Sequence, residues 1–474
     1  MKQAGSQEIA WRIDREGDNL SSQIAMQLRQ AIDRGELRPG DRLPPSRRLA
    51  VELRLARGTV TNAIEQLLAE GLLEARVGSG TYVSQAASWS NSSFSEQAIS
   101  SPAMLHDPPD ADIDPPVSVQ TDLRPCRPSL ELFPMTVWRR CVADAASAIP
   151  SSDYGDPCGD VLVRQEISDY LRRARGMVAD PDQIIITNGA VHAMHLLARL
   201  YLDDSRVAAV ENPGYPLARQ VLASTGALIR YCPVDEDGLV TDALVYGGLP
   251  LKVIYTSPSH QFPIGSRLSL TRRRELVGIA EKCDALIIED DYDGEFRYDV
   301  LPLPPMYTMA PERVVYCGTF SKTLFPGLRI GFAVAPREVI EAMAALRAVS
   351  EYAPSETLQR ALARFIGDGE YERHILRMRR LYATKRKRVT EGLESCRARA
   401  TGLESGLSAL IEIDPSTSAG MVSSSLLAQG IAVPALSRYD FTGDDQRNAL
   451  VLGYAEPPQA KLERAVEAIA RAVG

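Results

Sequence analysis

The sequence predicts a multidomain protein, in which a small α+β domain precedes a large α/β domain with a mostly parallel sheet. The chain has 474 residues, too many for one ordinary hydrophobic core. Residues 85–117 are rich in Ser, Pro and Asp and lack hydrophobic periodicity, as is typical of a flexible linker. Beyond the linker, apolar runs alternate with helical patterns, which indicates parallel strands and crossover helices. We therefore expect domains at 12–84 and 118–474.

Composition and charge exclude several classes of protein. Hydrophobic residues make up 45% of the chain, as in globular proteins. No run of about 20 apolar residues is present that could span a membrane, and the start of the chain has no signal-peptide core. The seven cysteines are scattered without a CxxC pair, which favours reduced thiols over disulfides or a metal site. We interpret the protein as cytoplasmic, without contact to a membrane.

The small domain is predicted to contain three helices and a hairpin. Ser21 or Ser22 can cap the first helix, in which apolar residues recur every four positions from Leu20 to Ile32, and Gly35 ends it. The other elements are a helix at 43–53, a helix at 57–71 and two strands around a glycine turn at 72–83. This order is that of a winged helix-turn-helix, whose second motif helix enters the major groove of DNA.

A local cluster of arginines supports DNA binding, although the whole chain has a net charge of −8. Residues 42–57 hold five arginines and one acid, Glu52. Three amphipathic helices alone would also fit a small adaptor with solvated arginines. The segments "GELRPGDRLPPSRRLA", "RGTVTNAIEQLLAEGLL" and "GSGTYV" resemble the GntR-type winged-helix domain. The resemblance implies double-stranded operator DNA as the partner, contacted by Arg47, Arg57, Thr59, Thr61, Gly78 and Gly80.

The large domain places reactive side chains after its predicted strands. The strands are expected at 183–187, 206–211, 251–256, 284–290, 313–318 and 330–335. Lys322 follows one of them in "YCGTFSKTLFPGLRIGF", and Asp290 ends another in "IIEDDYDGEF". Taken singly, Lys322 fits a lysine paired with a carboxylate, and Asp290 fits one of four acids in a solvated loop.

Considered together, these side chains are those that pyridoxal phosphate requires. Lys322 is expected to form the Schiff base, Asp290 to keep the pyridine nitrogen protonated, and Tyr292 to hydrogen-bond the ring oxygen. Tyr215 offers a ring for stacking. The phosphate is expected to be held at a helix N-terminus and by a permanent cation; the residues are Gly189, Ala190, Thr319, Ser321 and Arg329.

These motifs resemble a fold-type-I, class I aminotransferase domain across residues 118–474. A GntR domain, a linker and this domain in one chain are similar to the MocR (GabR-type) transcriptional regulators. The resemblance implies a pyridoxal-phosphate-dependent regulator that senses an amine or amino compound, or pyridoxal phosphate itself. It also implies a head-to-tail homodimer, in which Tyr154 of "DYGDPCGD" reaches the phosphate of the partner subunit.

Two departures from the aminotransferase pattern bear on turnover. Phe262 in "HQFPIG" stands where those enzymes have an asparagine, and Val451 in "LVLGYA" stands where they have the arginine for the substrate carboxylate. His260 and Gln261 can line the pocket, and His260 fits a structural role equally well. Either the effector lacks the usual carboxylate or another cation meets it, for which Arg438 and Arg447 are candidates.

Three functions stay open on the sequence alone. The preferred one is a regulator without net turnover, in which the aminotransferase-like domain performs at most a half-reaction. The first alternative is an active aminotransferase with a fused DNA-binding domain. The second is a DNA-binding module whose large domain is a dimerising scaffold without cofactor.

Overall fold

The internal contacts of the computed structural model divide the chain into two units, residues 1–103 and 104–474. The structure describes residues 11–15, 19–76, 78–86, 119–149, 151–244, 248–299, 303–394, 396 and 398–473. Apart from residues 85 and 86, the predicted linker lies outside these ranges, as does the predicted boundary at residue 118.

The first unit contains the three predicted helices, α1 (Leu20–Asp33), α2 (Ser46–Leu53) and α3 (Arg57–Ala69). Helix α1 packs against α3, and Ile24, Leu28, Val60 and Leu67 are buried between the elements. The predicted cap of α1 is wrong, because Ser21 and Ser22 lie inside the first turn. The cap is Asn19, whose short side chain tolerates the left-handed conformation and accepts a hydrogen bond from Ser22 N at 3.4 Å.

The predicted wing is an antiparallel hairpin of β1 (Leu73–Arg76) and β2 (Gly80–Val83). Arg76 pairs with Gly80 at its closed end. Gly80 has a φ of +117°, and a Cβ there would lie 3.0 Å from Arg42 Nε. The turn therefore needs glycine both for its backbone conformation and for the close approach of Arg42.

An eight-stranded sheet in the order β4-β11-β10-β9-β8-β5-β6-β7 forms the centre of the second unit. Its strands are β4 (Ile184–Thr187), β5 (Val207–Asn212), β6 (Leu228–Asp235), β7 (Gly238–Leu239), β8 (Leu251–Thr256), β9 (Leu286–Asp291), β10 (Val314–Thr319) and β11 (Gly331–Val334). Strands β6, β5, β8, β9 and β10 run parallel to their neighbours in this order. Strand β11 is antiparallel to both β10 and β4, and β7 is antiparallel to β6.

The mostly parallel sheet agrees with the sequence prediction, but two of its details do not. Strand β6 was missed, because its half-exposed residues do not form the continuous apolar run of the central strands. The connection from β10 to β11 contains no crossover helix; it holds a turn and a short 3-10 helix, Pro326–Leu328. An antiparallel neighbour needs no crossover, so this short loop is sufficient.

Helices cover both faces of the central sheet. One face packs against α5, α8 and α10, and the other packs against α6, α7 and α9. The helices of this unit are α4 (Met135–Ala146), α5 (Val161–Arg175), α6 (Ala190–Tyr201), α7 (Pro216–Ala223), α8 (Leu270–Cys283), α9 (Arg337–Ala348), α10 (Glu356–Gly367), α11 (Glu370–Leu393), α12 (Ala419–Ala428) and α13 (Gln459–Val473). This two-sided cover explains the continuous apolar runs of the central strands.

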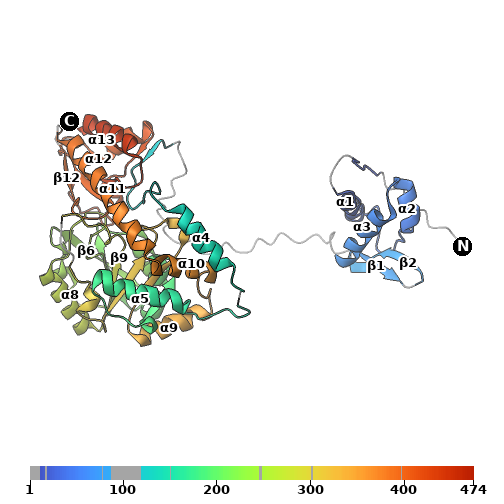
Figure 1. Cartoon of the computed structure of the whole chain (residues 1–474), viewed down its shortest axis with the longest axis horizontal. Coiled ribbons are helices and arrows are strands. Elements are labelled where there is room, and N and C mark those ends of the chain that lie inside the picture. Colours follow the sequence, from blue (N-terminus) through green and yellow to red (C-terminus); the bar gives the residue numbers. More distant parts are fainter. Residues whose placement is uncertain are drawn as a thin grey trace. The chain divides into compact units, whose positions relative to one another are not determined.

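A smaller subdomain follows the long helix α11, which runs from the sheet towards α12 and α13 in Figure 1. Its sheet has the order β12-β13-β15, from β12 (Arg399–Thr401), β13 (Ser408–Glu412) and β15 (Ala449–Gly453). A further pair joins β3 (Thr121–Asp122) to β14 (Ile431–Ala432) in parallel. Residues 121 and 122 are thereby fixed to the C-terminal subdomain.

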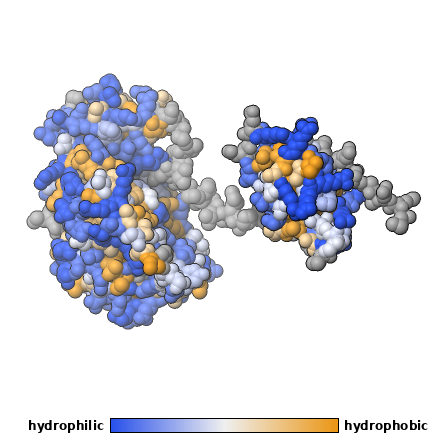
Figure 2. Space-filling model, turned by 45° about the vertical axis from the view of Figure 1, so that its right-hand side comes forward, coloured by the Kyte–Doolittle hydropathy of each residue, from blue (hydrophilic) through white to orange (hydrophobic). Residues whose placement is uncertain are grey.

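The surface in view carries scattered hydrophobic patches in a mainly hydrophilic surround (Figure 2). No helix in the described ranges combines the length and the hydrophobicity needed to cross a bilayer.

Candidate functional site

The carboxyl ends of the parallel strands open into a cavity of about 320 Å³. This size suits a small-molecule ligand. Nine of the ten predicted cofactor residues line it, namely Lys322, Asp290, Tyr292, Tyr215, Gly189, Ala190, Thr319, Ser321 and Arg329. The other lining residues are Pro125, Cys126, Arg127, Val191, Tyr255, Phe262 and Pro326. The site thus draws on seven separate segments of one unit.

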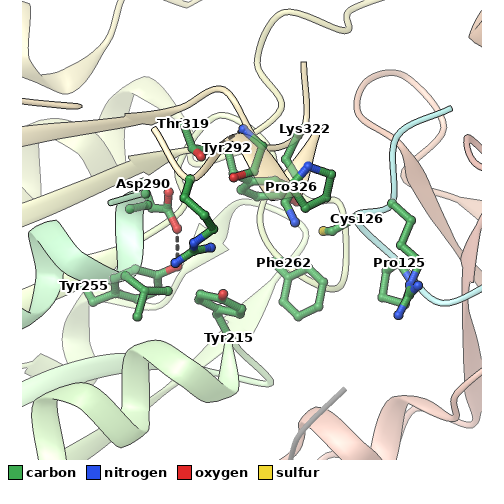
Figure 3. A pocket seen from close by; sticks show the side chains of 16 residues that line it. Pro125, Cys126, Tyr215, Tyr255, Phe262, Asp290, Tyr292, Thr319, Lys322 and Pro326 are labelled. Carbon is green, nitrogen blue, oxygen red and sulfur yellow. Dashed lines mark hydrogen bonds between the residues drawn. The ribbon is translucent and has the colours of Figure 1, made fainter. Parts of the chain in front are cut away.

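Lys322 lies in the turn that follows β10 and is half-buried at the cavity (Figure 3). Ser321 N donates a hydrogen bond to Thr319 Oγ1 at 3.2 Å, which shapes the start of this turn. No carboxylate among the described residues forms a salt bridge with Lys322, although its charge acts at longer range to lower the pKa of Asp290. The alternative of a lysine that serves as a structural ion-pair partner therefore does not fit.

Asp290, at the end of β9, is only 4% exposed, which rules out the solvated-loop alternative. Tyr255 donates a hydrogen bond to its Oδ2 at 2.8 Å, whereas its buried Oδ1 has no hydrogen-bond partner among the described residues. Burial raises the pKa of Asp290 to about 7, against the hydrogen bond from Tyr255 and the nearby charge of Lys322. An unpartnered buried acceptor of this kind suits a protonated ring nitrogen.

The cavity also offers a place for an anion, at the start of α6. Gly189 has a φ of +90° and precedes Ala190, and no side chain caps this helix N-terminus. Arg329 donates a hydrogen bond from Nη2 to Asn188 O at 2.9 Å, which holds its guanidinium beside Gly189. Free N–H groups at a helix N-terminus and a permanent cation together form an anion site.

Two aromatic side chains complete the predicted set. The Tyr215 ring packs edge-on against Phe262, with ring centroids 5.9 Å apart. The Tyr292 hydroxyl lies 3.1 Å from Nδ1 of His260, which in turn lies 3.0 Å from Asp293 Oδ2. Burial opposes the positive charge of His260, but the Asp293 carboxylate raises the pKa of His260 above its ordinary value. His260 does not line the cavity itself but orients the Tyr292 hydroxyl.

Some of the named residues lie outside the cavity. His260 and Gln261 are buried and do not line it; Gln261 donates hydrogen bonds to Glu211 and to backbone carbonyls, so both have structural roles. Tyr154 is 82% exposed, and its ring lies 5.2 Å from that of Tyr352. Tyr154 does not line the cavity of its own chain, and its predicted role at the phosphate of the partner subunit stays a prediction.

The two candidate cations for a ligand carboxylate also lie elsewhere. Arg438 is on a short 3-10 helix and does not line the cavity. Arg447 pairs with Asp445 and lines a second cavity with Asn212. Val451 is fully buried in an apolar cluster with Phe262.

Two further side chains that line the cavity, Tyr255 and Arg127, were not singled out from the sequence. Tyr255 lies in "LKVIYT", one residue before the end of β8 at Thr256. A hydroxyl-bearing side chain at the carboxyl end of a buried strand is a signal from which the sequence could have predicted it. Arg127 lies in "CRPSLELFP", which carries no periodic pattern, and only long-range contacts bring it to the cavity.

The first unit presents its predicted DNA residues on α2, α3 and the wing. Arg47 and Arg57 are exposed, and Arg57 begins α3. Thr61 donates a hydrogen bond to Arg57 O at 3.0 Å. Thr61, Gly78 and Gly80 line a groove between α3 and the wing, whereas Thr59 is half-buried and does not line it. Arg47 and Arg57 do not line this groove.

Comparisons with known proteins agree with both units. Residues 20–83 match the family of bacterial regulatory proteins, gntR family. Residues 127–469 match the family of aminotransferases of class I and II. The match of the first segment overturns the alternative of a helical adaptor.

The relatives carry both segments in one chain. The HTH-type pyridoxine biosynthesis transcriptional regulator PdxR of Corynebacterium glutamicum is 33% identical, over 97% of each chain. The probable rhizopine catabolism regulatory protein MocR of Rhizobium meliloti is 34% identical, over 94% of this chain and 92% of its own. The HTH-type transcriptional regulator TauR of Rhodobacter capsulatus is 34% identical, over 96% of each. The chain belongs to the MocR-type regulators.

The larger unit of this MocR-type regulator has the fold of solved aminotransferases. It is similar to the kynurenine aminotransferase of Pyrococcus horikoshii, with a TM-score of 0.69 and 25% identity over 75% of this chain and 91% of the enzyme. An archaeal alanine:glyoxylate aminotransferase gives a TM-score of 0.69 and 26% identity over 75% and 91%. The protein is therefore a transcriptional regulator with a GntR DNA-binding domain and an aminotransferase-like domain, a fold that implies dependence on pyridoxal phosphate.

Proposed function

We propose that this MocR-type regulator binds pyridoxal phosphate in the cavity at Lys322 and uses it to sense an amine or amino compound. The observation that supports this most strongly is the unpartnered Oδ1 of buried Asp290, which lies in the same cavity as Lys322. The uncapped start of α6 beside Arg329 supplies the matching anion site. Pyridoxal phosphate carries both a ring nitrogen and a phosphate, so it fits these features.

When bound, pyridoxal phosphate supplies an aldehyde that reacts with amines. Lys322 would tether it through its amine, and Asp290 would hold a proton on the ring nitrogen. Tyr292 would donate a hydrogen bond to the ring oxygen, and Tyr215 would pack on the ring. The phosphate would be held by Gly189, Ala190, Thr319, Ser321 and Arg329, all of which line the cavity.

The buried apolar cluster beside the cavity favours ligand sensing over turnover. Phe262 and Val451 belong to one buried cluster, in which Phe262 packs edge-on against Tyr439. Neither side chain can bind a substrate carboxylate, which is the role that the arginine of aminotransferases performs. A ligand that displaces Lys322 would therefore shift the balance between conformations of the regulator rather than pass through a catalytic cycle. Pyridoxal phosphate itself is the second candidate effector.

We further propose a head-to-tail homodimer that binds operator DNA through the first unit. The exposed Tyr154 supports a role in the cavity of the partner subunit, because it lies outside the cavity of its own chain. On the DNA side, Arg47 and Arg57 are proposed to contact bases or phosphates, Thr59 and Thr61 to lie nearby, and Gly78 and Gly80 to approach the backbone. The proposed order of parts is 12–84, linker 85–117, and 118–474.

The deciding experiment is covalent mapping of the bound cofactor. The purified protein should absorb in the visible range, and borohydride reduction followed by peptide mapping should place the pyridoxyl group on Lys322. The Lys322→Ala variant should fold but lose this absorption. Lys252→Ala is the matched control, because Lys252 pairs with Asp284 on the surface. A colourless wild-type protein, or a label on another lysine, contradicts the proposal.

A further inference from the structure

Two arginines share one carboxylate beside the cavity. Arg124 donates hydrogen bonds to Asp122 from Nε at 3.0 Å and from Nη2 at 2.7 Å, and its backbone N–H donates a third at 3.0 Å. Arg127 Nη1 lies 3.0 Å from Asp122 Oδ2. Since Arg124 already satisfies Asp122, the group carries one surplus positive charge, and Asp122 stays paired if Arg127 turns to a ligand.

The charged residues around this group leave its surplus positive charge in place. Burial and Asp122 raise the pKa of Glu456, and Lys385, Arg127 and Lys461 act on Glu456 in the opposite direction. Glu456 therefore has two lysines as cationic neighbours besides Arg127. Glu131 is a further carboxylate beside Lys385, so among the described residues three carboxylates face four cations here, and one positive charge remains.

The backbone that carries Arg127 is held in place. Leu123 N donates to Ala432 O at 2.8 Å, and Gly453 N donates to Leu123 O at 2.7 Å. A Cβ at Gly453 would lie 2.2 Å from Arg124 O, so the two segments touch closely. Cys126 then adopts a left-handed conformation with a φ of +63°, which turns the chain into the cavity wall. A fixed backbone orients the guanidinium at low entropic cost.

The segment of Arg127 lies at the far end of the cavity from Asp290. In Figure 3, Asp290 and Tyr255 lie on one side, Pro125 and Cys126 lie on the other, and Lys322 lies between them. Asp290 and the start of α6 are assigned to the cofactor. The end of the cavity at residues 125–127 is therefore the space left for the remainder of a ligand whose amine meets the cofactor at Lys322.

We propose that Arg127 binds a negatively charged group of the effector, so that the regulator senses an amine that also carries a carboxylate, sulfonate or phosphonate. This inference rests on the proposed function. The side chain of Arg127 is 39% exposed, so it can reorient towards a ligand while its planar guanidinium pairs with two anion oxygens. Arg127 would bind the negatively charged group from a different segment of the chain than position 451, so the ligand would not be held as an aminotransferase holds its substrate.

The other cations near the cavity do not meet this requirement. Arg329 lines the cavity at the start of α6, beside Gly189, where the phosphate is assigned. Arg447 is paired with Asp445 and lines a different cavity. Arg127 is thus the cation that lines the cavity without a role in the cofactor set, within the described residues.

The test is a titration with matched pairs of amines. The probes are linear amino acids and aminoalkyl sulfonates with one to four methylene groups, each paired with the amino alcohol of equal length. Half-saturation is read from the visible spectrum of the holoprotein and, independently, from calorimetry. Wild type, Arg127→Gln and the control Arg447→Gln, which removes the same charge outside the cavity, are compared.

We expect at least one anionic probe to bind wild type about tenfold or more tightly than its neutral partner, since hydrogen bonds between charged groups carry such a preference. Arg127→Gln should lose that preference but keep the visible spectrum and the affinity for the neutral amine, whereas Arg447→Gln should keep both. A preference that survives in Arg127→Gln, or is absent in wild type, refutes the role of Arg127. Absence of the visible spectrum in wild type would instead refute the proposed function.

Discussion

Substitution of Asp290 by asparagine should stabilise the cofactor-free protein at neutral pH and not in acid. Burial raises the pKa of Asp290 from 3.8 to about 7. Between these values the folded state binds a proton that the unfolded state has released, so this group lowers the stability as the pH rises from about 4 to 7. Asparagine has no such titration and can still accept the hydrogen bond of Tyr255.

The magnitude follows from the two pKa values. One pKa unit corresponds to 1.36 kcal/mol, so the full penalty above pH 7 is about 4 kcal/mol. At pH 4.5 the penalty is about 1 kcal/mol, because only the unfolded state has begun to ionise. The stability of Asp290→Asn relative to wild type should therefore rise by about 3 kcal/mol from pH 4.5 to pH 8. Any constant cost of the buried amide cancels in this change.

The assay is urea unfolding of protein freed of cofactor by hydroxylamine, followed by circular dichroism across this pH range. Glu289 is buried beside Asp290, and its pKa is also raised to about 7. Wild type alone therefore mixes two titrations, and only the difference between the two proteins reports on Asp290. Added pyridoxal phosphate should reduce this difference, since a protonated ring nitrogen compensates the carboxylate. If the free energies of unfolding of the two proteins change in parallel with pH, the burial cost assigned to Asp290 is refuted.

Asp291→Asn is the matched control, with the opposite expected sign. Asp291 is buried, but Arg175 at 3.0 Å and a hydrogen bond from Tyr316 at 2.7 Å lower its pKa below the ordinary value. Its contribution to stability is present above the unfolded pKa and is lost as the pH falls through the folded pKa. Asp291→Asn should therefore destabilise the protein at neutral pH, by about 3 kcal/mol or more.

Three further predictions concern the two units. Arg57→Ala should weaken binding to an operator selected from random duplexes by about 1–3 kcal/mol. The control Arg29→Ala removes an ion pair made by a residue on α1 and should not weaken it. If the two variants bind the operator with equal affinity, the interface lies elsewhere. Ordinary α-amino acids should leave the spectrum and the operator affinity unchanged, and tight binding that survives Arg127→Gln as well as Arg438→Ala and Arg447→Ala would show that position 451 was misinterpreted. Gly189→Ala should cost about 1–2 kcal/mol of stability and weaken cofactor binding, because its φ is +90°; unchanged fluorescence titrations with pyridoxal phosphate would contradict the anion site.

The sequence predicted those parts of the site that depend on local patterns. Lys322 and Gly189 each follow a buried strand, Asp290 lies at the end of one, and the carboxyl ends of parallel strands meet at one edge of a sheet. Their convergence therefore followed once the strands were recognised. The cap of α1 was placed wrongly because Asn19 and the following serines are equally good caps in sequence.

Long-range contacts account for the parts that were missed. Arg127 reaches the cavity because β3 pairs with β14, some 300 residues further along the chain, and no local pattern encodes that pairing. His260 was left between two roles, since its partner Asp293 lies on another segment. Tyr154 stays a prediction, because its proposed partner belongs to a second copy of the chain.

The pairing of β3 with β14 has a consequence for how such regulators can diversify. The groups assigned to the cofactor come from the central sheet and its loops, whereas residues 125–127 follow β3, a strand of a separate two-stranded sheet. Mutations in this short segment can therefore alter which compound is recognised while the tethering chemistry persists unchanged. Exchange of residues 125–127 between related regulators should exchange the effectors that they recognise. This segment is therefore the place at which to alter the specificity of a biosensor.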